Sequence, residues 1–240
     1  MKIWRFADPF DYNFAIAGLK GTWGPIREGQ GPCPECNSVR QRRIQPMIIE
    51  WEPGSEFVGD FSFLGGDSIA VTERVVHALQ GKFKGFELGP VQMVQDPKLK
   101  RPTRITKRTK PRVWLPYEGP LLFDLWITSW VQMDEDRSTA RIIRNCSTCG
   151  LKTYEVSGVE HVEYNKVEWK AEPSEFELLK WRIGRVSGQG IYVRRSDLKG
   201  ADIFRVHEFP AWIFCTNDVK EFIEIEGYTN VTFFEMGELV

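Results

Sequence analysis

Two short cysteine pairs constrain this 240-residue chain more than any other feature of its sequence. They are Cys33-Pro34-Glu35-Cys36 and Cys146-Ser147-Thr148-Cys149; each has the spacing C-x-x-C, and 109 residues separate them. A two-residue gap lets a tight turn direct both sulfurs at one point, and structural zinc sites take four ligands in a tetrahedron. Gly150 after the second pair and Asn37 after the first both tolerate the positive φ that such a turn often needs. The spacing therefore predicts one structural zinc site, with the ligands Cys33, Cys36, Cys146 and Cys149.

The same residues allow two other interpretations. A single C-x-x-C is also the thioredoxin-type redox motif, but that motif normally lies where a strand runs into a helix, and no helix pattern follows either pair. A structural disulfide is disfavoured in a reducing compartment. The fifth cysteine, Cys215, lies in the apolar run Trp212–Cys215, and a lone cysteine in such a run is expected to be buried and inert.

Composition limits the class and the compartment of the protein. The chain is 42% hydrophobic, with nine tryptophans and 16 phenylalanines, which is enough for a substantial core. Its net charge of −1 gives no overall attraction to nucleic acid or membranes. Residues 1–6 lack the apolar stretch of a signal peptide, and no window of about 18 apolar residues could span a bilayer. We therefore expect a cytoplasmic protein without a membrane partner.

A strand–helix–strand pattern occurs twice. The first copy has a short apolar strand at 69–71, a helical stripe over 75–79 and a strand from 86; the second has them at 212–214, 219–223 and 231–234. An offset of 144 relates Thr72 to Thr216, Val75 to Val219 and Leu79 to Ile223, with the threonines as candidate helix N-caps. Such units are common, so three matched positions could also arise by chance.

These features predict the fold class. We expect an α+β protein of mostly antiparallel strands with a few helices, in two lobes joined at a four-cysteine, zinc-ribbon-like site. The N-terminal lobe, 1–112, would contain the first cysteine pair and a basic loop. The C-terminal lobe, 113–240, would contain the second pair and the C-terminal strand–helix–strand unit. Alternating residues at 159–169 predict further strands, and 173–177 could open a short helix.

The basic segment is Lys98–Arg112, KLKRPTRITKRTKPR, in which eight of fifteen residues are basic and two are proline. It cannot bury a face, so we expect an exposed loop. It could be a patch for nucleic acid or for an acidic protein, or simply a solvated loop. No aromatic residue is interleaved in it, which disfavours single-strand binding by stacking.

Catalytic motifs are missing from the sequence. It contains no G-x-G-x-x-G after a strand, P-loop, H-E-x-x-H or G-x-S-x-G. The three histidines, His77, His161 and His207, are isolated from one another. A zinc ion with four cysteine ligands has no open coordination position, so it would be structural. A binding protein is therefore expected rather than an enzyme, and the enzymatic alternative is a site assembled from scattered carboxylates.

The C-P-x-C at 33 and the C-x-x-C-G at 146 together resemble the double-CxxCG motif family, a paralogous set of myxobacterial proteins linked to immunity against polymorphic toxins. The stretch from Gly200 through Asp202-Ile203-Phe204-Arg205 to Gly237 is similar to the end of a broader class of bacterial immunity proteins, in which a D-[IL]-F-R segment leads to a helix and a closing strand. Asn37 stands where the family name implies glycine.

The resemblance implies a cytoplasmic immunity protein that neutralises a cognate toxin by stoichiometric binding. If that toxin cuts nucleic acid, its basic active site should meet acids of this chain, and complementary charge would speed their association. The candidate acids are Asp134, Glu135, Asp136, Glu221, Glu224 and Glu226. An acidic toxin would instead favour the segment Lys98–Arg112. The alternative function is a zinc-ribbon protein that binds nucleic acid through this segment.

Overall fold

A computed structural model describes residues 1–9, 11, 13–20, 23–25, 32–38, 41–43, 46–64, 68–104, 106, 109–159 and 185–240. Within these ranges the chain is mostly strands with two α-helices, which confirms the expected α+β class. The strands expected between 161 and 169 and the helix expected at 173–177 lie outside the described residues. Neither described helix has the length and apolar character needed to cross a membrane.

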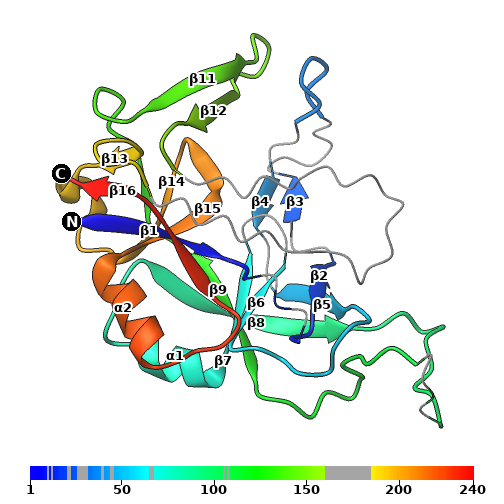
Figure 1. Cartoon of the computed structure of the whole chain (residues 1–240). Helices are drawn as coiled ribbons and strands as arrows, with labels where there is room; N and C mark the ends of the chain where they lie inside the picture. The colour runs from blue at the N-terminus through cyan, green and yellow to red at the C-terminus, as the bar shows by residue number, and fades with distance from the viewer. Residues whose placement is uncertain are drawn as a thin grey trace.

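The first sheet gathers strands from both ends of the chain (Figure 1). Its order is β10 (Trp130–Val131), β14 (Ile203–Val206), β15 (Phe209–Thr216), β1 (Lys2–Ala7), β16 (Thr232–Leu239) and β13 (Ile191–Val193). The pairs β10–β14 and β13–β16 are parallel, and the other pairs are antiparallel. The N-terminal strand β1 therefore lies between two C-terminal strands.

The second sheet is built from the first half of the chain and one later strand. Its order is β2 (Ala17–Leu19), β5 (Met47–Trp51), β8 (Phe86–Val94), β9 (Leu122–Ile127), β7 (Ile69–Thr72) and β6 (Phe61–Phe63). Only β5–β8 is parallel. Since β9 lies in this sheet and β1 in the first, each sheet takes a strand from the other side of the expected boundary between residues 112 and 113.

The two predicted strand–helix–strand units are present and share one topology. In the first, α1 (Glu73–Leu79) connects β7 to β8, and in the second, α2 (Asn217–Ile225) connects β15 to β16. In each unit a third strand pairs antiparallel with both flanking strands: β9 lies between β7 and β8, and β1 lies between β15 and β16. The inserted strand follows the first unit in sequence but precedes the second.

The two threonines predicted as helix N-caps lie at the N-cap positions, but their side chains do not cap the helices. Thr72 and Thr216 are the N-cap residues of α1 and α2 and have extended backbones, but neither side chain makes a cap hydrogen bond. The Thr72 hydroxyl donates instead to the Asp60 carboxylate at 3.0 Å. These helices are therefore held chiefly by their apolar faces, of which Val75, Val76, Leu79, Val219 and Ile223 are buried.

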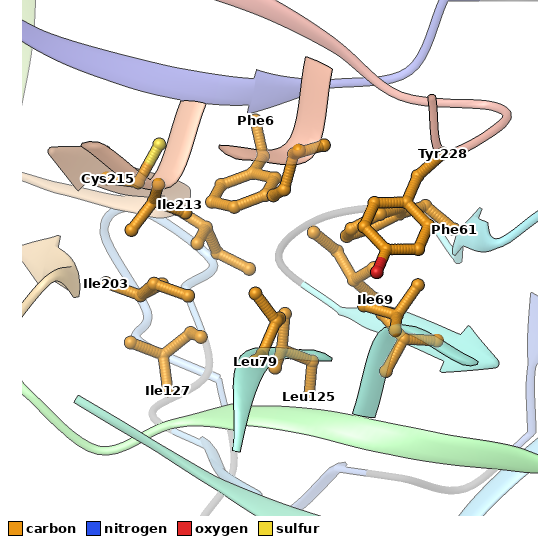
Figure 2. Packing of buried hydrophobic residues seen from close by; sticks show 14 of the residues in the cluster. Phe6, Phe61, Ile69, Leu79, Leu125, Ile127, Ile203, Ile213, Cys215 and Tyr228 are labelled. Atoms are coloured by element: carbon orange, nitrogen blue, oxygen red, sulfur yellow. The ribbon is translucent and has the colours of Figure 1, made fainter. Parts of the chain in front are cut away.

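The central core joins the two sheets and the two helices. Figure 2 shows Phe6, Ile203 and Ile213 of the first sheet on one side of this core, and Leu125 and Ile127 of the second sheet on the other. Cys215 is fully buried in the same cluster, as expected, and burial raises the pKa of its thiol well above the ordinary value. Both units thus bury their helices against one apolar interior.

The outer face of each sheet has its own apolar cluster, because side chains alternate along a strand. Phe204 and Phe214 point away from the central core and stack with ring centroids 5.9 Å apart. On the second sheet, Met47, Ile49 and Trp51 form the corresponding cluster.

Candidate metal centre

Two hairpins outside the main sheets contain the four motif cysteines. The first pairs β3 (Trp23–Pro25) with β4 (Gln41–Arg43), and Cys33–Cys36 lie between these strands in sequence. The second pairs β11 (Ala140–Asn145) with β12 (Lys152–Val156), and Cys146–Cys149 form its tip (Figure 1). Two hairpins, each contributing one C-x-x-C, give the arrangement expected of a zinc ribbon.

The two turns repeat one backbone pattern. The Asn37 N–H donates to the Cys33 carbonyl at 2.8 Å, and the Gly150 N–H donates to the Cys146 carbonyl at 2.9 Å. The predicted left-handed backbone is present at both positions, with φ of 57° at Asn37 and 71° at Gly150. Asparagine can therefore replace glycine after the first pair, because it is one of the residues that tolerate this conformation.

The four sulfurs converge on one point. Cys33 Sγ lies 3.7 Å from Cys146 Sγ, Cys36 Sγ lies 3.5 Å from Cys149 Sγ, and all four sulfurs lie within 4.8 Å of one another. A tetrahedral zinc with bonds of about 2.3 Å requires sulfurs about 3.8 Å apart. A disulfide requires about 2.05 Å, and all five cysteines of the chain are free thiols. We call these four residues the thiol cluster; it is a candidate site for a thiophilic metal ion.

The surroundings of the sulfurs differ between the two turns. The side-chain hydroxyl of Ser38, 2.9 Å from Cys36 Sγ, is the main cause that lowers the pKa of Cys36 to about 6. At Cys146 the backbone N–H of Cys149 acts to lower the pKa, but burial and the Cys149 thiol raise it to about 12. Without a cation, some thiols of the cluster therefore keep their protons, and metal binding would have to release them.

The carboxylate of Glu35 links the two cysteine turns outside the thiol cluster. Glu35, inside the first C-x-x-C, accepts hydrogen bonds from the hydroxyls of Ser147 and Thr148, both at 2.7 Å. It also accepts from the backbone N–H groups of the same two residues, at 3.2 and 3.0 Å. The Thr148 hydroxyl, then the Ser147 hydroxyl and N–H, lower the pKa of Glu35 to about 2. Glu35 of the first C-x-x-C is thus hydrogen-bonded to both middle residues of the second, Ser147 and Thr148.

Sequence reasoning missed this contact. An acceptor within C-P-E-C and two donors within C-S-T-C are the only local signal, and 111 residues separate Glu35 from Ser147. The hydrogen bonds between Glu35 and these two donors can be recognised only in the folded structure, where the two cysteine turns lie side by side. Four cysteine ligands would fill a tetrahedral shell, so an ion held here would crosslink the hairpins and leave no position for a substrate.

Two of the three predicted partner residues at 134–136 line a shallow polar hollow. Asp134 is buried, and its carboxylate accepts a hydrogen bond from Arg194 Nε at 3.1 Å. This hydrogen bond is the main cause that lowers the pKa of Asp134. Glu135 and Asp136 are exposed, and Asp136 lines the hollow together with Asp134 and Arg194.

The predicted partner residues of the C-terminal unit lie on the exposed side of α2. Glu221 accepts from the Asn217 side-chain amide at 2.7 Å, and Glu224 pairs with Lys220 at 2.5 Å. Glu226 follows the helix and is also exposed. These three acids therefore face solvent, whereas Asp134 faces Arg194.

The basic segment forms no helix or strand in its described part. Lys98, Lys100, Arg101, Arg104 and Lys110 are exposed, as a solvated loop requires. Arg112 is the exception in this part of the segment: it is buried, and its Nε donates to the Trp51 carbonyl at 3.0 Å.

No protein-family model matches the sequence, and no curated protein matches it either.

Proposed function

We propose that this chain is an immunity protein that neutralises a cognate bacterial toxin by stoichiometric binding, and that the thiol cluster holds a structural zinc ion. The observation that supports the proposal most is the convergence of four sulfurs, from two cysteine pairs that 109 residues separate, at distances that suit tetrahedral zinc. Thiolate ligands favour zinc over harder cations. The bound ion would supply a crosslink, while the protein surface would supply recognition. The cytoplasm, where thiols stay reduced, suits both roles.

Asp134, next to Arg194, is not suited to act as a general acid. A general acid at neutral pH needs a raised pKa, whereas the hydrogen bond from Arg194 lowers the pKa of Asp134. Its ion pair with Arg194 instead holds the residue after β13 beside the turn at 135–137.

Co-expression tests the proposed function directly. We expect a neighbouring gene to encode the toxin, the chain to form a 1:1 complex with this toxin domain, and the complex to restore growth of cells that express the toxin. An unrelated toxin domain should give neither complex nor protection, since specificity depends on matched surfaces. Unprotected cells together with no complex would contradict the proposal.

Exposure of the basic segment favours a second candidate, a zinc-ribbon protein that binds nucleic acid. Lys98, Lys100, Arg101 and Arg104 all face solvent and could reach phosphates. Affinity for phosphates falls steeply as salt increases, because binding releases counterions. Binding to an arbitrary duplex that shows this dependence, and is lost when these four residues are replaced by glutamine, would support the second candidate over the first.

A further inference from the structure

A shallow groove lies where the two strand–helix–strand units meet, at the start of α1. Its volume is about 490 Å³. The residues that line it come from the segments around 13 and 57, from β7 and α1, and from the loops at 120 and 229; they include Phe14, Phe57, Val58, Asp60, Arg74 and Pro120. We call it the Phe57 groove.

Large apolar side chains are exposed at this groove. Phe57 is 66% exposed, and Leu121, which follows the lining residue Pro120, is 61% exposed. Single exposed apolar residues are ordinary on protein surfaces. An exposed aromatic side chain that lines a hollow is instead characteristic of an interaction site.

The polar floor of the groove is already satisfied. The Asp60 carboxylate accepts from the Thr72 hydroxyl at 3.0 Å, from Arg74 at 3.1 Å, and from the Thr229 N–H and hydroxyl at 2.9 and 3.0 Å. Arg74 also donates to the Glu226 carbonyl at 2.8 Å. The groove is therefore held open by contacts within the chain, and the charge of Arg74 is balanced by Asp60.

Four exposed glutamates lie close to lining residues of the groove, although none of them lines it. Glu56 precedes Phe57, and Glu118 lies two residues before Pro120. The Glu73 N–H donates to the Leu121 carbonyl at 3.0 Å, which places Glu73 at the same edge. Glu226 is attached to the rim through Arg74. With Arg74 paired to Asp60, the rim carries an excess of negative charge.

We infer that the Phe57 groove is the docking surface for a protein partner that presents an apolar side chain on a basic surface. The inference rests on the proposed function, and it assigns the toxin-binding surface to the junction of α1 and α2. The apolar centre would supply affinity, and the acidic rim would select a basic partner and speed its association. Nucleic acid does not fit this surface, because its phosphates would meet the four glutamates.

The test uses the toxin domain that the proposed function expects a neighbouring gene to encode, catalytically inactivated, with binding to the full chain measured by biolayer interferometry. Phe57→Ser should weaken binding at least about tenfold, as expected for the loss of an aromatic anchor. Ile143→Ser is the matched control, since Ile143 is 57% exposed on β11, away from the groove. It should leave the affinity within about twofold. Leu121→Ser provides a second groove variant if Phe57→Ser folds poorly.

Charge reversal tests the rim. Glu73→Lys with Glu226→Lys should slow association, and Glu87→Lys, at an exposed acid of β8 that does not line the groove, should not. For the wild type, raising NaCl from about 50 to about 500 mM should reduce the association rate as well.

The outcomes separate the two proposals. Toxin binding that is weakened by Phe57→Ser and unaffected by Ile143→Ser supports the groove. Equal binding by the wild type, Phe57→Ser and Leu121→Ser would overturn the groove and leave the proposed function intact. If the wild type does not bind the toxin domain, the proposed function fails, and this assignment of the groove fails with it.

Discussion

Glu35 links the two turns of the candidate metal site. Its carboxylate spans the turns through four hydrogen bonds, and the cysteines on either side of it, Cys33 and Cys36, belong to the thiol cluster. Groups that orient metal ligands in this way commonly change metal affinity by about 10- to 100-fold when they are removed. Glu35 thus positions the ligands without being a ligand.

Glu35→Gln should lower zinc affinity by about 10- to 100-fold, because an amide oxygen accepts these four donors less strongly than a carboxylate. Competition with a chromophoric chelator measures the change. Glu135→Gln, at an exposed acid outside the thiol cluster, is the control and should bind zinc like the wild type. Equal affinities for all three proteins would show that Glu35 does not position the site.

The lowered pKa of Glu35 gives a pH dependence with a definite sign. Its pKa is about 2 in the folded protein, against an ordinary value of 4.5. A carboxylate with a lowered pKa stabilises the fold above its ordinary pKa, and this contribution is lost as pH falls toward the folded value. The difference in stability between the wild type and Glu35→Gln should therefore be constant above pH 5 and shrink between about pH 4.5 and 2. Denaturant titrations across this range measure it, and a constant difference would contradict the assignment.

At the scale of elements, helices α1 and α2 both pack against the central core. Leu79 of α1 and Ile223 of α2 are equivalent in the repeat and are both buried in the central core. Local pattern was enough to predict these units, because helical spacing of apolar residues and strand runs depend on neighbouring residues alone. It could not show that β1 and β9 complete them, because pairing such as Ile3 with Thr216 joins residues more than 200 positions apart.

Leu79→Ala should destabilise the protein by about 2–5 kcal/mol, through lost burial and the cavity left behind. Ile223→Ala should cost a similar amount, since it removes the equivalent contact. Ile225→Ala is the matched control: Ile225 is 83% exposed at the end of α2, and a surface change of this kind costs no more than about 0.5 kcal/mol. Urea denaturation compares the three. A loss at Ile225 as large as that at Leu79 would contradict the assignment of the buried face.

At the scale of the whole molecule, the thiol cluster joins the two peripheral hairpins. The motif residues and their positive φ values could be predicted, because C-x-x-C spacing and turn chemistry are local. The hydrogen bonds of Glu35 could not, because they exist only once the fold brings its two halves together. The same holds for the Phe57 groove, whose walls come from five separate segments of the chain.

Cys146→Ser should lower the free energy of unfolding by several kcal/mol in the zinc-loaded protein, because it removes metal-coupled stabilisation. Bound zinc should fall in parallel, as measured by elemental analysis. Cys215→Ser is the control for zinc content, since Cys215 is buried in the core and lies outside the cluster; it should keep its zinc. Unchanged stability in Cys146→Ser would show that the cluster does not hold the fold together.

The most direct test of the central claim is zinc-edge X-ray absorption on the purified, zinc-loaded protein. Four sulfurs at about 2.3 Å from one zinc per chain is the result that this structure predicts. A first shell with nitrogen or oxygen ligands, or zinc that binds without using all four cysteines, would contradict it.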